Sequence, residues 1–158
     1  AAKIIKLKYP NTKFQLLGPL GVENRTSISD ERMAAWEREG FIEYLGETTD
    51  IKPYIEKACC VVLPSYREGT SRVLLEAASM GRPIIASDVP GCREVVNNGI
   101  TGLLCRSKDY RDLSLKMEDM INLSFEERKI MGTKGREKIK KEFNQEIVHG
   151  LYLDAIGN

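Results

Sequence analysis

Short apolar runs alternate along this chain with amphipathic stretches, and turns rich in Gly, Pro and polar residues separate them. The apolar runs predict strands at residues 14–17, 42–45, 59–63, 83–87 and 102–105. Helical spacing predicts helices at residues 1–9, 29–40, 50–57, 71–80 and 92–96, and Ser29 is the expected N-cap of the second. From Tyr110 onward the pattern is helical, with breaks expected near Leu123-Ser124 and near Gly132 to Gly135.

This alternation predicts the fold class. Strands that are separated by helices form a parallel sheet with right-handed crossovers. The strands are apolar throughout, which is typical of a sheet covered on both faces. We therefore expect a single α/β domain over residues 1–158, a Rossmann-like, doubly wound parallel sheet, with its ligand at the carboxyl ends of the strands.

Composition excludes several classes of function. The 24 basic and 23 acidic residues nearly cancel, so no nucleic-acid partner is indicated. No apolar stretch has the ~20 residues that a membrane span needs, and no signal peptide is visible, so we expect a cytoplasmic location. The four cysteines form no C-x-x-C pair, which favours free thiols in a reducing compartment over a disulfide or a metal site.

Two further features are interpreted as surface. The single histidine, His149, has no Ser or Cys signature near it, which argues against a catalytic triad. The basic run from Lys134 to Lys141 is interpreted as a solvated helix face in preference to a membrane-facing patch.

The most informative segment is the turn between the third predicted strand and the following helix, Glu68-Gly69-Thr70-Ser71. Small residues at a helix start leave N–H groups free for an anion, and the helix dipole adds to the attraction. Glu68 before the turn and Glu76 inside the helix could then accept hydroxyl groups of the same ligand, as a nucleotide sugar would require.

Each part of this turn also has an ordinary explanation. Glu76 could be an exposed helix residue paired with Arg72, and Glu68 a solvated loop acid. Thr70 and Ser71 could be simple capping residues, although neither has the glutamate or glutamine of a capping box. A second turn-rich segment, residues 87–102, forms either a wall of the same cleft or a connection. The glycine motifs of dinucleotide-binding and P-loop proteins are absent.

Taken together and in order, the motifs from Pro64 to Leu104 resemble the signature region of family 4 glycosyltransferases, which are retaining enzymes of the GT-B fold. The matching features are Pro64-Ser65, Glu68 and Glu76 with seven residues between them, Glu76-Ala77, Gly81-x-Pro83, Gly91-x-x-Glu94 and Asn98-Gly99-x-Thr101-Gly102. The segment is similar to bacterial enzymes that build capsule, O-antigen or other lipid-linked glycans.

The resemblance implies a role for each matching position. Glu76 would hold the ribose hydroxyls of the nucleotide, and Glu68 would contact the transferred sugar at the reacting face as the catalytic residue. Gly46 and Glu47 would lie beside the base. The segment from Gly69 to Val73 would meet the sugar and the diphosphate: Gly69, Thr70, Ser71, Arg72 and Val73. The family usually needs no metal, because the helix dipole and basic side chains stabilise the leaving diphosphate.

The resemblance also implies that parts are missing. In the family, an arginine and a lysine that grip the diphosphate lie just upstream of the first helix of this domain, and this sequence starts inside that helix. The acceptor domain of the family lies further upstream. We therefore expect the C-terminal, donor-binding half of a two-domain enzyme, inactive by itself, whose full-length form acts in the cytoplasm or at the inner face of the membrane.

The expected function is to bind a nucleotide sugar, above all a UDP-sugar. The full-length enzyme would transfer a hexose or N-acetylhexosamine to a glycan or a polyprenyl-diphosphate-linked acceptor. Two alternatives stay open: a non-catalytic nucleotide-sugar-binding module, and a fragment of a GT-B nucleotide-sugar epimerase. No cofactor or metal is expected.

Overall fold

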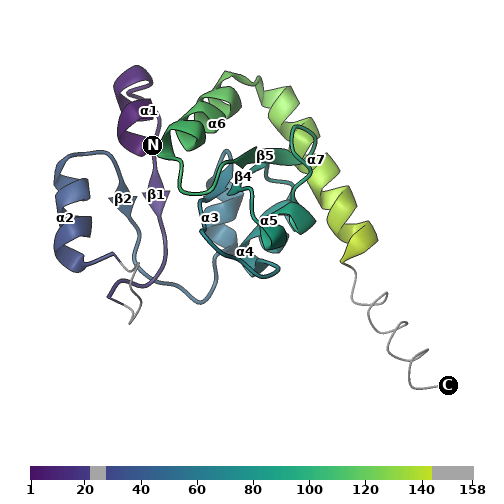
Figure 1. The fold of residues 1–158 in the computed structure, drawn as a ribbon, viewed down its shortest axis with the longest axis horizontal. Helices are drawn as coiled ribbons and strands as arrows, with labels where there is room; N and C mark the ends of the chain where they lie inside the picture. The colour runs from purple at the N-terminus through teal and green to yellow at the C-terminus, as the bar shows by residue number, and fades with distance from the viewer. Residues whose placement is uncertain (22–27, 144–158) are drawn as a thin grey trace. The chain divides into compact units, whose positions relative to one another are not determined.

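A computed structural model describes residues 1–21 and 28–143 (Figure 1). His149 and the end of the chain lie outside the described residues. The chain divides into two compact units, Ala1–Ile51 and Lys52–Asn158, and each is described by itself.

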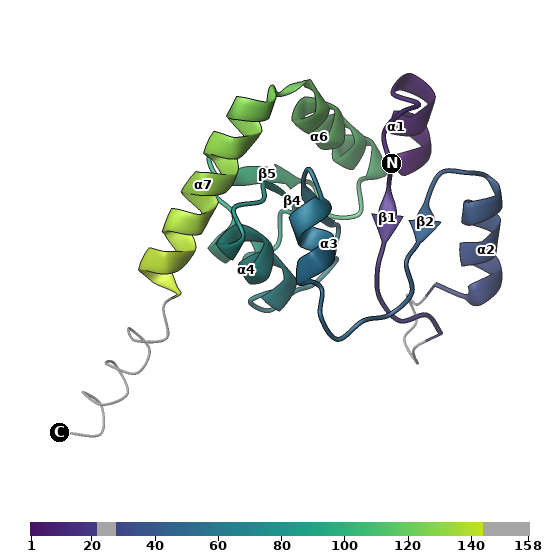
Figure 2. The same ribbon diagram turned by 180° about the vertical axis from the view of Figure 1, so that it is seen from behind.

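In residues 1–21 and 28–51, the first unit has two helices and a pair of parallel strands (Figure 2). Ser29 caps its second helix by accepting a hydrogen bond from the Arg32 N–H, as predicted. Ile5 and Met33 are its buried apolar side chains in the part of the chain that the structure describes. The elements are α1 (Ala2–Lys8), β1 (Gln15–Leu16), α2 (Asp30–Arg38) and β2 (Glu43–Tyr44).

The second unit is a three-stranded parallel sheet with helices between and after its strands (Figure 1). The strand order is β3-β4-β5, and the register places Leu63 opposite Ala86 and Ile84 opposite Gly102. The strands are β3 (Val61–Leu63), β4 (Ile84–Ser87) and β5 (Gly102–Cys105). The helices are α3 (Lys52–Lys57), α4 (Arg72–Ser79), α5 (Pro90–Val95), α6 (Tyr110–Asn122) and α7 (Phe125–Glu142).

Strand β4 lies at the centre of the second unit. All four of its residues are buried, and successive side chains of a strand point to opposite faces. Both faces of the strand are therefore covered, as its apolar sequence predicts. Helices α4 and α6 both pack against it.

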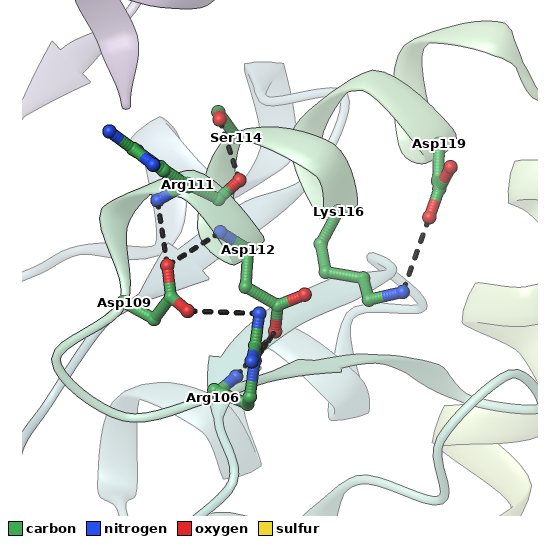
Figure 3. A network of polar contacts seen from close by, with 7 residues as sticks. All are labelled: Arg106, Asp109, Arg111, Asp112, Ser114, Lys116 and Asp119. Carbon is green, nitrogen blue, oxygen red and sulfur yellow. Dashed lines mark hydrogen bonds and ion pairs between the residues drawn. The ribbon is translucent and has the colours of Figure 1, made fainter.

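The start of α6 is fixed by a polar network at the end of β5 (Figure 3). Asp109 accepts hydrogen bonds from the Asp112 and Arg111 N–H groups, both at 3.0 Å, and its other carboxylate oxygen pairs with Arg106. The Asp112 N–H, with help from Arg106, holds the pKa of Asp109 below its ordinary value. The Arg106 N–H in turn donates to the Asp112 carboxylate at 2.6 Å. The network sets the direction in which the chain leaves the sheet.

Helix α7 corrects one prediction. The break near Leu123-Ser124 is confirmed, because α6 ends at Asn122 and Ser124 begins α7 with a capping box. The second break, near Gly132 to Gly135, is wrong, because α7 continues through both glycines. Gly132 is required for packing, because a Cβ at this position would lie 1.9 Å from the Gly81 carbonyl oxygen. Helix α7 can therefore approach the end of α4 only without a side chain there.

Several element boundaries also differ from the prediction, and two of them have a clear physical reason. Helix α5 begins at Pro90 and not at Cys92, because proline is well suited to the first turn of a helix. Strand β3 begins at Val61, leaving Cys59 and Cys60 outside it. Val61 pairs with Ile84, the first residue of β4, so the two preceding residues have no strand partner.

Candidate functional site

The loops that follow β3, β4 and β5 meet at one edge of the sheet, because the three strands are parallel and in register. The Asp88 N–H after β4 donates to the Cys105 carbonyl at the end of β5, at 2.7 Å. This is the carboxyl edge, where α/β sheets bind ligands. The segment Glu68 to Ser71 belongs to the first of these loops.

Ser71 occupies the N-cap position of α4 with an extended backbone, φ −78° and ψ 117°. Its side chain is buried and makes no capping hydrogen bond, and the first turn of α4 contains no acidic residue. A helix start without a side-chain cap and without an acidic residue in its first turn leaves its N–H groups and its dipole available to an anion. The absence of a capping box was predicted; the lack of any side-chain cap among these residues makes the turn better suited to an anion.

Glu76 lies one turn into α4, next to the buried Ala77 and Ala78, and is itself half-buried. The described residues contain no ion pair between Glu76 and Arg72, the partner considered from the sequence. Val73 on the same helix is 37% exposed. Glu76 is thus a half-buried helix residue and not a surface residue paired with Arg72, and its role in the site stays a prediction.

The loop itself is exposed at Gly69 and Thr70, whereas Glu68 is half-buried. Burial is the main cause that raises the pKa of the Cys92 thiol to about 11, and the nearby Glu68 carboxylate adds to this increase. Glu68 therefore lies close to α5, whose Gly91 also adjoins its backbone carbonyl.

Helix α5 touches this loop at two points. A Cβ on Gly91 would lie 1.9 Å from the Gly69 carbonyl oxygen and 2.6 Å from that of Glu68, so the two backbones are in direct contact. In addition, the Thr70 hydroxyl donates a hydrogen bond to the Glu94 carboxylate at 2.7 Å. The motif Gly91-x-x-Glu94 was noted in the sequence only as part of the resemblance, and the contact of Glu94 with Thr70 was not foreseen.

Basic side chains at the same edge are held by neighbours. Arg93 binds the Asp88 carboxylate, and Lys108 lies over the Tyr66 ring, 5.4 Å from its centroid. The Asp88 bond is the main reason that the pKa of Arg93 is raised. Lys108 has a positive φ of 61°, rare for a residue with a side chain. Cationic groups are therefore close to the loop that carries Glu68.

The segment 87–102 is divided between the two edges of the sheet. Residues up to Glu94 follow β4 and adjoin the candidate site, whereas Asn97 to Thr101 lead into the amino end of β5. The second part is tied inward: the Thr101 hydroxyl accepts from the Asn97 N–H, and Lys138 of α7 donates to the Asn97 side chain at 2.7 Å. Of the two interpretations, a wall of the cleft suits the first part and a connection suits the second.

Gly46 and Glu47 belong to the first unit, after β2. Gly46 has a φ of +79°, which favours glycine, and its carbonyl accepts from the Gly18 N–H at 2.9 Å. Tyr44 donates its hydroxyl to the Gly18 carbonyl at 2.8 Å. These bonds order the loop in which the base-proximal residues were predicted, and the role of Gly46 and Glu47 stays a prediction.

Over residues 1–21 and 28–143, no group of three or more His, Cys, Asp and Glu side chains could hold a metal ion. The four cysteines are free. In the same described part of the chain, none of the helices combines the length and the apolar character needed to cross a bilayer.

Comparison with known proteins identifies relatives over most of the chain. Residues 1–122 match the family described as "Glycosyl transferases group 1". The N,N'-diacetylbacillosaminyl-diphospho-undecaprenol alpha-1,3-N-acetylgalactosaminyltransferase of Campylobacter jejuni is 32% identical over 72% of this chain and 30% of its own. The capsular polysaccharide biosynthesis glycosyltransferase CapM of Staphylococcus aureus is 28% identical over 92% of this chain and 38% of its own. This chain thus spans about a third of the length of these relatives.

Solved structures share the fold. Sucrose-phosphate synthase from Thermosynechococcus elongatus matches 99% of this chain and 42% of its own with a TM-score of 0.81, at 24% identity. HepE of Anabaena in complex with UDP-glucose matches 96% and 43%, with a TM-score of 0.79 at 21% identity. The C-terminal domain of the group 1 glycosyl transferase LpcC from Francisella tularensis matches 90% and 76%, with a TM-score of 0.75 at 21% identity. These matches confirm the predicted α/β fold of a GT-B C-terminal half.

Proposed function

Because this chain belongs to the group 1 glycosyl transferases, we propose that it binds a nucleotide sugar, above all a UDP-sugar, at the carboxyl edge of the β3–β5 sheet. The observation that carries the proposal is the start of α4. It has no side-chain cap and no acid in its first turn, it follows the Glu68-Gly69 loop, and it is followed by the half-buried Glu76. A diphosphate at this helix start would accept hydrogen bonds from the backbone N–H groups that the Ser71 side chain does not cap.

The remaining site residues have complementary roles in this proposal. Glu76 accepts the ribose hydroxyls, because a half-buried carboxylate is stabilised by donors of this kind. Glu68 binds hydroxyls of the transferred sugar at the reacting face. Gly69 leaves room for the ligand, since no atom lies within 4 Å of the place where its Cβ would be.

The relatives support a role in building surface glycans. One matched relative is named as a transferase of N-acetylgalactosamine to a diphospho-undecaprenol-linked sugar, and another as a capsular polysaccharide glycosyltransferase. HepE, which has the same fold, was solved with UDP-glucose. For the protein that contains this chain, we infer transfer of a hexose or N-acetylhexosamine, with retention, to a glycan or a polyprenyl-diphosphate-linked acceptor.

The proposal includes two expectations about catalysis. The helix dipole and basic side chains would stabilise the leaving diphosphate without a metal. The 158-residue chain would bind the donor but not turn it over, because it spans only about a third of the length of its relatives.

Calorimetric titration of the 158-residue chain tests donor binding. We expect UDP to bind about tenfold more tightly than UMP, because the second phosphate adds a charge-assisted contact at the α4 start. Glu76→Ala should weaken the binding of both nucleotides by about tenfold or more, since it removes the carboxylate that accepts hydrogen bonds from the two ribose hydroxyls. Glu137→Ala, on the exposed face of α7, is the matched control and should bind as the unchanged chain does.

Equal affinities for UDP and UMP, together with no effect of Glu76→Ala, would contradict the site. The reaction itself is tested on the full-length protein with a panel of UDP- and GDP-sugars, with the anomeric configuration of the product read by NMR. Transfer with retention supports the proposal. Donor binding without transfer supports the alternative of a non-catalytic module, and interconversion of free nucleotide sugars supports the epimerase.

A further inference from the structure

The β3–α4 loop is held by few bonds of its own. Within the described residues, no hydrogen bond between backbone groups outside the helices and strands involves residues 64–70. In the same described residues, the side chains of this loop make one hydrogen bond, which the Thr70 hydroxyl donates to Glu94. A loop with so few internal bonds would sample several conformations unless its neighbours restrain it.

Helix α5 supplies that restraint. Gly91 packs directly on the carbonyl groups of Glu68 and Gly69, and Glu94, one turn further along the same helix, holds the Thr70 hydroxyl. One contact is with the backbone carbonyl groups of Glu68 and Gly69, and the other is with the Thr70 side chain. Helix α5 therefore restrains the backbone of the loop at consecutive residues, directly before the start of α4.

The Glu94 carboxylate is directed to Thr70 because its basic neighbour is engaged elsewhere. Arg93 donates to both the carboxylate and the carbonyl of Asp88. The described residues show no salt bridge between Glu94 and a basic side chain. A bond from a hydroxyl to a carboxylate at 2.7 Å is charge-assisted and stronger than a neutral one.

We propose that Glu94 is a positioning residue of the donor site: through Thr70 it holds the Glu68–Ser71 loop in the conformation that binds the sugar and diphosphate of the nucleotide sugar. This inference rests on the proposed function for its ligand. Its geometric part, the restraint of the loop by α5, stands on this structure alone. Glu94 acts through Thr70, and no contact of Glu94 with the ligand is part of the proposal.

Four variants of the 158-residue chain isolate the contact. Glu94→Ala removes the acceptor and Thr70→Val removes the donor, whereas Glu94→Gln and Thr70→Ser keep them. The probe is UDP-N-acetylglucosamine, titrated by calorimetry. We expect about a fivefold or larger loss of affinity for Glu94→Ala and for Thr70→Val, and no further loss when the two are combined, because both remove the same bond.

The conservative variants separate positioning from other roles. Glu94→Gln should bind within about twofold of the unchanged chain, since its amide oxygen still accepts the hydrogen bond, and Thr70→Ser should lose less affinity than Thr70→Val, since it keeps the donor. Glu137→Ala controls for the loss of an exposed carboxylate. If the losses of affinity in the two single variants multiply in the double variant, the proposal is overturned. It is also overturned if Glu94→Gln binds the ligand as weakly as Glu94→Ala while Thr70→Val binds normally, because that result would indicate direct contact of Glu94 with the ligand.

Hydrogen exchange without ligand keeps this test separate from the proposed function. Amides of residues 69–73 should exchange several-fold faster in Glu94→Ala than in the unchanged chain, and at the normal rate in Glu94→Gln. Failure of the unchanged chain to bind any nucleotide would contradict the proposed function, and the exchange data would still decide the restraint. Unchanged exchange in Glu94→Ala would overturn the proposal whatever the binding result.

Discussion

Gly91 shows how a single position can link two neighbouring loops. It lies in the first turn of α5, where alanine would favour the helix by about 1 kcal/mol over glycine. Its missing Cβ, however, is the space that the Gly69 carbonyl occupies. For Gly91→Ala, packing and helix propensity therefore predict changes of opposite sign in the free energy of unfolding.

Gly91→Ala is expected to destabilise the chain by about 1–3 kcal/mol, because the loop must move to admit the methyl group. Chemical denaturation measures the change in the free energy of unfolding. Gly69→Ala is the control for stability alone, since nothing lies within 4 Å of its Cβ position. A stability gain in Gly91→Ala would show that propensity outweighs the contact.

Two thiols give the second unit a dependence on alkaline pH. Burial, above all, raises the pKa of Cys60 to about 12 and that of Cys92 to about 11. An unfolded thiol ionises near pH 8.5, so above that pH the unfolded state releases protons that the folded state retains. The stabilisation is complete below the unfolded pKa and is lost as pH rises toward the folded pKa.

We expect stability to fall as pH rises from about 9 toward 11, by at most about 1.4 kcal/mol per pH unit for each of these thiols. Cys92→Ala should show a shallower decline over that range than the unchanged chain. Denaturant titrations at stepped pH values measure both slopes. Cys59→Ala should change the slope less than Cys92→Ala, because Cys59 is exposed and only its charge adds to the raised pKa of Cys60, and equal slopes in all three proteins would contradict the assignment.

At the scale of elements, the junction between α6 and α7 depends on one polar turn. Ser124 and Glu127 exchange hydrogen bonds between side chain and backbone, and Arg128 donates to the Leu123 carbonyl. The bonds to Ser124 hold the pKa of Glu127 below its ordinary value. The stabilisation is therefore present above the unfolded pKa and is lost as pH falls through the folded pKa.

Glu127→Gln should lower the melting temperature at neutral pH by a few degrees and should show a smaller further loss below about pH 4. Glu126→Gln, in the same first turn but outside the capping box, is the matched control. Melting curves recorded from pH 3 to 7 make the comparison. Parallel curves for the two variants would argue against a special role of the box.

The elements also show how far a sequence specifies this fold. Apolar runs flanked by turns located all five strands, because a strand covered on both faces has few polar residues. The predicted start of β3 was wrong by two residues because strand length depends on a partner far along the chain. Gly132 was misjudged for the same reason: glycine weakens a helix locally, and only the approach of α7 to Gly81 explains its presence.

The site shows the same division. Ser71, Glu68 and Glu76 are near one another in sequence, so local rules and a family resemblance could group them. Glu94 is 24 residues from Thr70, and no local pattern reveals that their side chains meet. That contact exists only because two parallel strands end at the same edge.

At the scale of the whole molecule, buried apolar side chains are unevenly distributed. Of those that the described residues show, Ile5 and Met33 belong to residues 1–51, and the others belong to the second unit. Local stability follows the amount of apolar surface that a region buries.

We therefore expect amides of β1 and β2 to exchange with solvent well before those of β4, by at least about tenfold in rate. Hydrogen exchange of the 158-residue chain, read by mass spectrometry of peptides, provides the measurement. Equal protection of β1 and β4 would mean that the two units unfold as one. Tyr44→Phe, which removes the hydroxyl bond to Gly18, should speed exchange in the first unit only.

The contact between Gly91 and the Gly69 carbonyl has one more consequence, for detection. Two backbones that touch without an intervening side chain transmit small displacements directly. A fluorophore on an exposed position of α5 would sense a change in the loop although it lies outside the loop. It can be attached to a cysteine that replaces Arg93, once the exposed Cys59 has been replaced. Helix α5 is thus the place to attach an optical sensor for the conformation of the Glu68–Ser71 loop.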